Sequence, residues 1–432
     1  MTVRFGTDGI RGRASDEITV DLAYRLGRAV ATVFSVPIYV GYDTRESSPT
    51  LAAAVLAGLR DGGANGVNLG YFTTPGVAVI AQQRGGAGVV VSASHNPYYD
   101  NGLKVLGLGG AKLDLATEAA VESALETVEG PSDEDFEVVE IDVSAEHEYV
   151  KHLRELAPAD LSRLRIVVDC AHGAASHVAY ELFASTGADV TVIHDQPDGR
   201  NINEDAGSTH VGRLIETVRE LNADFGLAVD GDADRLIAID SEGTVRDGDD
   251  LMVLFALDRA ARGVLGGGIA VTSMSNLGLN RALSAAGIEI EETDVGDRNV
   301  LVALEERSWI LGGEQSGHVI FRDLAPTGDG LLTGLLLAEL IRRRGPLADL
   351  AGAAWRRVPQ ELFSVSREHF SEPVVQDLFD ELLAQYGVAR SDVRLLVRPS
   401  GTEPLVRVMI EALNAEFVEV FCERLTSLYG RR

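Results

Sequence analysis

The sequence predicts an α/β protein made of several similar units, followed by a smaller α+β unit. Two observations predict this fold class. First, short apolar runs stop at small polar turns and helix-like segments follow, as in "VPIYVGYDTRESSP", "AGVVVSASHNP", "LRIVVDCAHGAA" and "GGIAVTSMSNLG". Unbroken runs of this kind are typical of strands buried on both faces, and their alternation with helices favours parallel sheets. Second, the 46 glycines suggest many strand-to-helix turns.

The pattern occupies the first three quarters of the 432 residues. At roughly 150 residues per domain, this length suggests about three domains, with four compact ones possible. Three stretches are expected to mark domain edges. They are the acidic segment 129–142, the Asp-rich turn at 247–250 and "WRRVPQ" at 355–360. The residues after the last edge are expected to form the smaller α+β unit, with a few strands and two helices.

The charge of the chain excludes some classes of function. The formal net charge is -28 and is dispersed, which argues against a nucleic-acid partner, because phosphate backbones bind basic surfaces. Only three lysines occur, Lys104, Lys112 and Lys151, and such a composition is typical of adaptation to high salt. No apolar run approaches the ~18 residues of a membrane helix, and no secretory signal is evident. With only two cysteines, we expect a cytoplasmic protein without disulfides or a membrane partner.

The strongest spacing signal is "VDGDADRLIAID", in which three aspartates alternate directly after an apolar run. The carboxylates of Asp230, Asp232 and Asp234 would repel one another unless a cation neutralised them, and an all-oxygen ligand set points to Mg²⁺. An EF-hand is excluded because its sixth position would be Arg235 instead of glycine, and its twelfth Ser241 instead of glutamate. A solvated acidic turn is the alternative, but it need not follow a buried strand so closely.

A second signal lies in "VVVSASHNPYYDNGLK", residues 89–104. A serine at the tip of a strand-to-helix turn could carry a phosphoryl group covalently, and the open position of a three-carboxylate Mg²⁺ site would suit a phosphate oxygen. A hydrolase is disfavoured because the G-x-S-x-G elbow is absent. The residues alone do not choose between Ser92 and Ser94. His95 and Asn96 have equal claims to shaping the turn and to a direct role.

Three further stretches carry chemistry. In "LLVRPSGTEPLVRVM", a tight turn at 400–402 offers backbone N–H groups to an anion, and Arg398 and Arg407 flank it with planar donors. "GGEQSGHVI" places Glu314, Ser316 and His318 among glycines, where they could bind sugar hydroxyls. "FGTDGIRG" adds an arginine in a glycine-rich turn. The last two signals are weak alone.

These five stretches, in this order, resemble the α-D-phosphohexomutase superfamily over essentially the whole chain. The resemblance implies four domains around a central cleft, the first three sharing an α/β core with mixed, mostly parallel sheets. On this basis we expect domain I at 1–145 with the active serine, domain II at 146–247 with the metal loop, domain III at 248–356 with the sugar loop, and domain IV at 357–432 with the phosphate loop.

The resemblance also implies roles for individual residues. It selects Ser94 as the phosphoserine, and the catalytic positions it matches are Ser94, Lys104, Arg11 and His318. The metal ligands it matches are Ser94, Asp230, Asp232 and Asp234, with Ala233 replacing the glycine of the superfamily's loop. The substrate-binding positions it matches are Glu314, Ser316, Arg398, Ser400, Gly401, Thr402 and Arg407.

The implied reaction is an intramolecular phosphoryl exchange by an isomerase with Mg²⁺, one ion per subunit, and a hexose 1,6-bisphosphate as activator and intermediate. Details of the motifs, such as Gln315 in "GGEQSGH", resemble the enzymes for glucosamine phosphates more than those for mannose or glucose phosphates, which are the alternative. A phosphatase would release phosphate, and a sugar-phosphate sensor would lack the catalytic groups. We expect a small hexosamine or hexose phosphate as the partner, and a monomer or homodimer.

Overall fold

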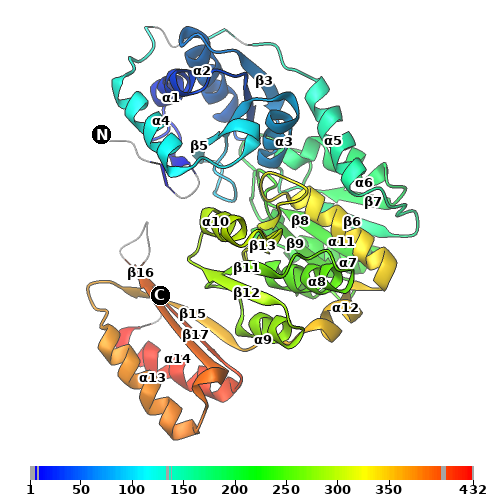
Figure 1. Ribbon diagram of the computed structural model, residues 1–432, viewed down its shortest axis with the longest axis vertical. Coiled ribbons are helices and arrows are strands. Elements are labelled where there is room, and N and C mark those ends of the chain that lie inside the picture. The colour runs from blue at the N-terminus through cyan, green and yellow to red at the C-terminus, as the bar shows by residue number, and fades with distance from the viewer. Residues whose placement is uncertain (1–4, 7–8, 133–135, 138, 400–404, 431–432) are drawn as a thin grey trace. The chain divides into compact units, whose positions relative to one another are not determined.

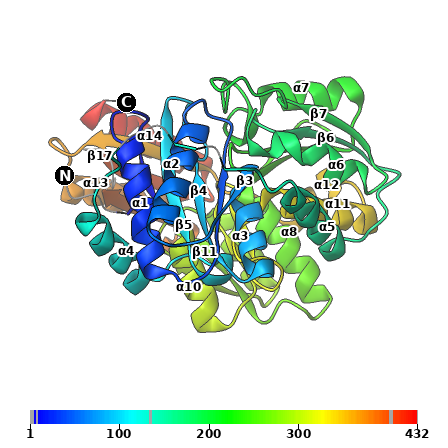
Figure 2. The same ribbon diagram turned by 90° about the horizontal axis from the view of Figure 1, so that it is seen from above.

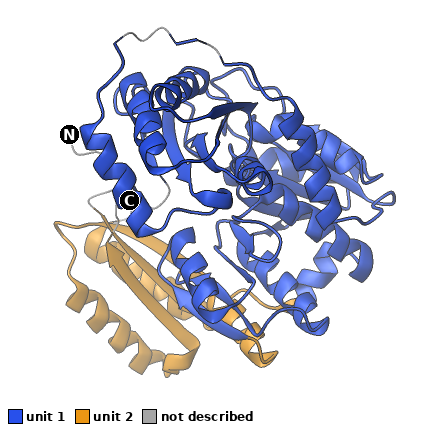
Figure 3. Cartoon of the chain, turned by 45° about the horizontal axis from the view of Figure 1, so that its top comes forward, with its two compact units in different colours: residues 1–273, 289–353 blue, residues 274–288, 354–432 orange. Residues whose placement is uncertain are grey.

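The computed structural model describes residues 5–6, 9–132, 136–137, 139–399 and 405–430 (Figure 1). It divides into two compact units (Figure 3). Unit 1 holds residues 1–273 and 289–353, and unit 2 holds residues 274–288 and 354–432. Across the described ranges, none of the helices combines the length and the apolar character that crossing a membrane requires.

The first sheet of unit 1 has the order β1-β5-β4-β2-β3, with β2, β3 and β4 parallel and β1 and β5 antiparallel to their neighbours. Its strands are β1 (Ile10–Arg13), β2 (Ile38–Tyr42), β3 (Gly66–Tyr71), β4 (Ala87–Val91) and β5 (Asp100–Leu106). The helices around it are α1 (Val20–Val33), α2 (Ser48–Asp61), α3 (Thr74–Arg84) and α4 (Leu115–Thr127).

Helices cover both faces of this sheet (Figure 2). α1 and α2 share one apolar core with alternate residues of β2 and β4. Val77 of α3 packs on the other face, against Gly41 and Gly88. α1 and α2 approach closely because a Cβ on Gly27 would lie 2.2 Å from the carbonyl oxygen of Val55, so no side chain fits there. The layering follows from strands that are apolar on both faces.

The second sheet has the order β10-β9-β8-β6-β7 and the third has β12-β11-β13-β14. Their strands are β6 (Arg165–Asp169), β7 (Asp189–Ile193), β8 (Phe225–Val229), β9 (Leu236–Asp240), β10 (Val245–Arg246), β11 (Gly268–Thr272), β12 (Glu289–Thr293), β13 (Leu311–Gly313) and β14 (Val319–Phe321). The associated helices are α5 (Ser144–Leu156), α6 (Ala179–Ala184), α7 (Gly212–Leu221), α8 (Gly248–Ala261), α10 (Asp297–Arg307), α11 (Gly330–Arg344) and α12 (Leu347–Ala354).

The three sheets share one arrangement. In each, a parallel set of three strands is followed by one strand that returns antiparallel: β5 beside β4, β9 beside β8, and β14 beside β13. The parallel neighbours are β2 and β3 in the first sheet, β6 and β7 in the second, and β11 and β12 in the third. The prediction of similar α/β units with mixed sheets is therefore confirmed.

Unit 2 contains a three-stranded antiparallel sheet of order β15-β17-β16. Its elements are β15 (Gln360–Ser366), β16 (Val393–Pro399), β17 (Leu405–Ala412), α9 (Leu277–Ala285), α13 (Glu372–Tyr386) and α14 (Ala415–Tyr429). α13 and α14 pack on one face through a core that includes Val375, Val408 and Phe417. The expected α+β unit of a few strands and two helices is confirmed, and α9 joins it from an earlier part of the chain.

Candidate functional site

The three loops that the sequence indicated in unit 1 occupy equivalent places in the three sheets. Residues 92–99 join β4 to β5, residues 230–235 join β8 to β9, and residues 314–318 join β13 to β14. The expectation that the serine caps a strand-to-helix turn is wrong, because "DNGLKVL" forms β5, which is buried along nearly its whole length. A short apolar run after a turn predicts a buried strand or a buried helix equally well.

The serine loop is bent at Ser94, whose φ is +53°. A non-glycine residue in this left-handed region costs roughly 1–2 kcal/mol, so its neighbours must hold it. The Ser92 hydroxyl accepts a hydrogen bond from the backbone N–H of Ser94 at 2.9 Å. The Ser94 hydroxyl donates to Oδ2 of Asp230 at 2.5 Å. Ser92 thus shapes the turn, while Ser94 faces the acidic loop.

The acidic loop brings three buried carboxylates together. One oxygen from each of Asp230, Asp232 and Asp234 lies within 4.8 Å of the other two. Lys104, from β5, donates to Asp232 at 2.7 Å and lies 3.7 Å from Asp234. Oδ1 of Asp232 and Oδ1 of Asp234 are buried without a hydrogen-bond partner. Oxygens that converge in this way, together with the serine hydroxyl, fit a divalent cation with hard ligands.

The charges of this loop are incompletely balanced by protein cations. Burial, followed by repulsion from Asp234 and Asp232, raises the pKa of Asp230 from 3.8 to about 8. Burial alone would raise the pKa of Asp234 too, but Lys104, His318 and Arg235 outweigh it and lower that pKa below its usual range. The cations beside Asp234 thus favour its charged form, whereas Asp230 keeps its proton near neutral pH, as expected of a metal site before a metal displaces that proton.

The loop after β13 carries His318 to the same place. Its ring is buried, and Nδ1 lies 3.7 Å from Oδ1 of Asp234. Burial alone would lower the pKa of His318, but Asp234 outweighs it and raises that pKa to about 9. Glu314 is half-buried and accepts from the backbone N–H of Gly296 at 3.1 Å, whereas Ser316 is exposed. His318 is therefore joined to the acidic loop, and the other two lie on its solvent side.

Arg11 lies on β1, opposite Gly102 of β5, and is half-buried. Gly102 accepts from the backbone N–H of Ser92, so this strand pair supports the serine loop. Burial, followed by the charges of Arg235 and Arg11, lowers the pKa of His95 to about 4. The imidazole is thus neutral near pH 7, and its Nδ1 lies 3.3 Å from Oγ of Ser94. The imidazole thus lies within hydrogen-bond distance of that hydroxyl, with donor and acceptor roles set by the ring tautomer.

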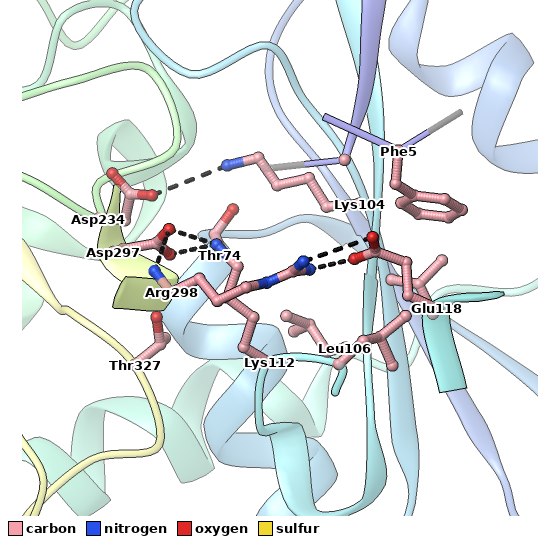
Figure 4. Close-up of a pocket in the computed structure, with 13 residues that line it drawn as sticks. Phe5, Thr74, Lys104, Leu106, Lys112, Glu118, Asp234, Asp297, Arg298 and Thr327 are labelled. Carbon is pink, nitrogen blue, oxygen red and sulfur yellow. Dashed lines mark hydrogen bonds and ion pairs between the residues drawn. The ribbon is translucent and has the colours of Figure 1, made fainter. Parts of the chain in front are cut away.

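A small cavity of about 30 Å³ adjoins Lys104 and Asp234 (Figure 4). Its walls carry two ion pairs, Lys112 with Asp297 and Arg298 with Glu118. The pairs join the segment around α4 to the first turn of α10. Lys104 and Asp234 thus share the lining of this cavity with the two ion pairs.

Unit 2 carries the two predicted phosphate-binding arginines. Arg398 on β16 lies directly opposite Arg407 on β17, and Ser364 on β15 continues the row. Arg407 donates to the hydroxyl of Ser364. Like charges directly opposite each other destabilise a sheet, so the pair is typical of an anion site. Ser400, Gly401 and Thr402 lie outside the described residues.

The sequence did not indicate one residue of the acidic cluster, Thr74. Its hydroxyl donates to Oδ2 of Asp232 at 2.5 Å, and its backbone N–H donates to the Asp232 carbonyl at 3.0 Å. In the sequence, "TTPG" reads as an ordinary helix start, and Thr73 does cap α3. Nothing local distinguishes the second threonine.

Comparison with known proteins places the chain in a family. Four models of phosphoglucomutase/phosphomannomutase domains match in consecutive order: α/β/α domain I at residues 2–131, domain II at 147–243, domain III at 247–358 and the C-terminal domain at 372–427. The chain belongs to the phosphoglucomutase/phosphomannomutase family. The predicted resemblance to the phosphohexomutases is confirmed, and so is the predicted enzyme class, an isomerase.

Within this family, the chain is similar to curated phosphoglucosamine mutases. Those of Macrococcus caseolyticus and of Leifsonia xyli subsp. xyli are 42% and 44% identical to it, over 98% and 99% of this chain and 98% of each relative. A solved phosphoglucomutase/phosphomannomutase family protein from Burkholderia thailandensis is 26% identical, with a TM-score of 0.79 over 99% of this chain and 98% of that chain.

A more distant likeness concerns the fold alone. The N-acetylphosphoglucosamine mutase of Aspergillus fumigatus, solved in complex with GlcNAc-6P and magnesium, is 18% identical, with a TM-score of 0.68 over 99% of this chain and 95% of that chain.

Proposed function

We propose that this enzyme interconverts glucosamine 6-phosphate and glucosamine 1-phosphate through a phosphorylated Ser94 and a 1,6-bisphosphate. One observation carries the proposal: the Ser94 hydroxyl lies 2.5 Å from Asp230, within a loop of three buried carboxylates. A serine that serves only as a structural hydroxyl has no need of a metal site at its oxygen. The curated phosphoglucosamine mutases, at 42% and 44% identity over nearly the whole chain, support the choice of sugar.

Asp230, Asp232, Asp234 and the Ser94 oxygen would hold one Mg²⁺ per subunit. The ion would neutralise charge that develops on the transferring phosphoryl oxygens. One oxygen each of Asp232 and Asp234 is buried without accepting a hydrogen bond, which supports this ligand set. Lys104, at 2.7 Å from Asp232 and 3.7 Å from Asp234, offsets part of the negative charge of these two buried side chains.

The chemistry then needs two transfers. A free sugar hydroxyl loses its proton as its oxygen attacks the phosphorus of phosphoserine 94, and the bond from phosphorus to Oγ breaks. In the second transfer, the serine oxygen attacks the other phosphate of the bisphosphate and releases the isomeric monophosphate. Lys104 and Arg11 stabilise negative charge on the moving group, and His95 and His318 are placed to carry protons.

The phosphate that does not react needs an anchor in both orientations of the sugar. Arg398 and Arg407, with Ser400, Gly401 and Thr402 between them in sequence, supply this anchor. Glu314 and Ser316 bind hydroxyl groups of the ring. A hexose 1,6-bisphosphate serves as the activator, because it phosphorylates a serine that has lost its phosphoryl group.

The domain division at 1–145, 146–247, 248–356 and 357–432 belongs to the same proposal, and the order of the matching family models supports it. We also propose a cytoplasmic location, since a chain with only two cysteines cannot build a disulfide framework. A monomeric or homodimeric state and adaptation to high salt stay predictions.

A coupled assay tests the function. The purified enzyme is given glucosamine, glucose or mannose 6-phosphate, each primed with the matching 1,6-bisphosphate. We expect the highest kcat/KM with glucosamine 6-phosphate and no release of inorganic phosphate. Faster turnover of mannose or glucose phosphate would reassign the substrate, and stoichiometric phosphate release would identify a phosphatase instead.

A further inference from the structure

Two backbone carbonyl oxygens of the serine loop accept hydrogen bonds from the same two side chains. The carbonyl oxygen of Ser94 accepts from Nη2 of Arg45 at 3.1 Å and from Nδ2 of Asn203 at 2.9 Å. The carbonyl oxygen of Asn96 accepts from the same two nitrogens, at 2.6 and 3.1 Å. We call Arg45 and Asn203 the carbonyl clamp. It fixes the peptide planes between Ser94 and His95 and between Asn96 and Pro97 with four hydrogen bonds.

The two donors come from different parts of unit 1. Arg45 follows β2, 49 residues before Ser94, and Asn203 lies in the loop between β7 and α7, 109 residues after it. The same interface carries a hydrogen bond of 2.5 Å from the Thr44 hydroxyl to the carbonyl of His172. The serine loop is therefore held from two sheets at once.

Arg45 is fully buried, and so is Asp43, with which it forms an ion pair. Asp43 also accepts from the Ser48 hydroxyl at 2.8 Å. Burying an ion pair is costly, and a well-packed apolar pair is often at least as stable. Stability alone therefore gives no reason for a guanidinium at this place. Its planar fork reaches a carboxylate and two carbonyls together, which an apolar side chain cannot do.

The backbone explains why the loop needs such a support. Ser94 is left-handed at φ +53°, and Asn203 is left-handed at φ +59°. Such residues persist where surrounding contacts determine their conformation, and they gather at functional sites. The position of the Ser94 oxygen against Asp230 depends on this turn, since the side chain leaves the backbone at the bent residue.

We propose that Arg45 and Asn203 are positioning residues for the phosphoryl-transfer steps. They hold Ser94 in its left-handed turn. Its Oγ then lies beside Asp230 and in line with the phosphorus and the sugar oxygen that attacks or leaves. The inference rests on the proposed mutase function and adds two residues that touch neither substrate nor metal ligand side chains. Displacement of a reacting group by about 1 Å can slow a reaction about a hundredfold, so the clamp acts on kcat.

The test uses two variants of the full chain with matched controls. Arg45→Met keeps an unbranched apolar side chain and removes the guanidinium donors. Asn203→Gly accepts the left-handed backbone and removes the amide. Arg84→Met is the first control, because Arg84 is a partly buried arginine paired with Asp142 and Glu148 away from the loop. Asn222→Gly is the second, since Asn222 is an exposed asparagine at φ +48°.

Two quantities are measured on folded protein: kcat and KM for glucosamine 6-phosphate, and the rate at which glucose 1,6-bisphosphate phosphorylates Ser94, followed by intact mass. We expect each clamp variant to lower kcat and the phosphorylation rate about 10- to 100-fold, with KM changed less than about threefold. Arg45→Lys, which keeps the positive charge and one donor nitrogen, should recover part of the loss. The controls should keep wild-type rates.

The outcomes separate the two proposals. If Asn203→Gly folds and keeps wild-type kcat and phosphorylation rate, the clamp does not position Ser94, whatever Arg45→Met does to folding. A rise in KM without a fall in kcat would also overturn the inference. If the wild-type enzyme phosphorylates Ser94 but isomerises no sugar phosphate, the proposed function fails, while the phosphorylation rates of the variants still test the clamp.

Discussion

Protonation of the acidic loop should make the proposed binding of Mg²⁺ depend on pH. Without metal, the pKa of Asp230 is raised from 3.8 to about 8 by burial and by its two neighbouring carboxylates. Below that pH the loop holds one proton, which a cation must displace, because Mg²⁺ binds the carboxylate form. Above that pH the loop holds no proton, so the cation displaces none. Affinity for Mg²⁺ should therefore rise with pH and then level off near pH 8.

The size of the effect follows from the difference between the pH of the experiment and the pKa of Asp230. Each pH unit below it costs about 1.4 kcal/mol of apparent binding free energy. At pH 6, two units below, affinity should be about a hundredfold weaker than on the plateau. The raised pKa also means that the metal-free protein loses stability as pH rises from 3.8 towards 8, because the unfolded chain releases this proton above pH 3.8 while the folded protein still holds it. Mg²⁺ should thus stabilise the fold most at the upper end of this range.

Isothermal titration calorimetry measures both parts of this prediction. Titrations with MgCl₂ at pH 6, 7 and 9, in buffers of different ionisation enthalpy, give the affinity and the number of protons released. We expect close to one proton released at pH 6 and 7, and none at pH 9. Asp230→Asn, which cannot bind that proton, should show weak binding without pH dependence. Equal affinity at pH 6 and 9 in the wild type, with no proton released, would refute the reasoning.

Three further changes test the site. In Gly231→Ala, the new Cβ would lie 2.6 Å from the carbonyl oxygen of Ser94, so we expect kcat to fall about a hundredfold while KM changes little. In Lys104→Met, loss of the buried partner of Asp232 should destabilise the metal-free protein by about 3–5 kcal/mol in urea titrations, and Mg²⁺ should restore part of that loss. Arg407→Met should raise the KM for glucosamine 6-phosphate about 10- to 100-fold, through lost charge-assisted hydrogen bonds of about 1.5–3 kcal/mol.

Each of these has a matched control. Gly263 is open around its would-be Cβ but has a φ of +71°, so Gly263→Ala tests backbone strain without crowding and should leave kcat unchanged. Lys151 is exposed, and Lys151→Met should not change stability measurably. Arg424→Met, on an exposed arginine of unit 2, should leave KM unchanged. Wild-type values in any of the three site variants would contradict the role assigned to that residue.

The acidic loop could be found from sequence because its ligands are close together in the chain. Asp230, Asp232 and Asp234 alternate after a buried run, and mutual repulsion at this spacing already demands a cation. The fold class could be predicted for a similar reason, since buried strands and helices differ in local periodicity. The element after the serine loop could not be predicted, because β5 contains an apolar run that suits a strand or a helix.

The supports of the site lie beyond the reach of local patterns. Thr74 forms a hydrogen bond with Asp232, which is 158 residues away in the sequence. Asn203 forms one with Ser94, which is 109 residues away. Neither residue differs in its own neighbourhood from an ordinary turn or cap residue. Local sequence could not choose between Ser92 and Ser94 for the same reason. The choice depends on which hydroxyl accepts a backbone N–H and which reaches Asp230, and both partners are defined only after folding.

The central claim is that Ser94 passes a phosphoryl group to glucosamine 6-phosphate and recovers one from the same sugar. The most direct measurement is a single-turnover chase: enzyme labelled with ³²P on Ser94 is mixed with excess glucosamine 6-phosphate and Mg²⁺. We predict that the label leaves the protein at a rate no slower than kcat and appears in glucosamine 1,6-bisphosphate and monophosphate. Label that stays on the protein during turnover, or appears as inorganic phosphate, would contradict the account.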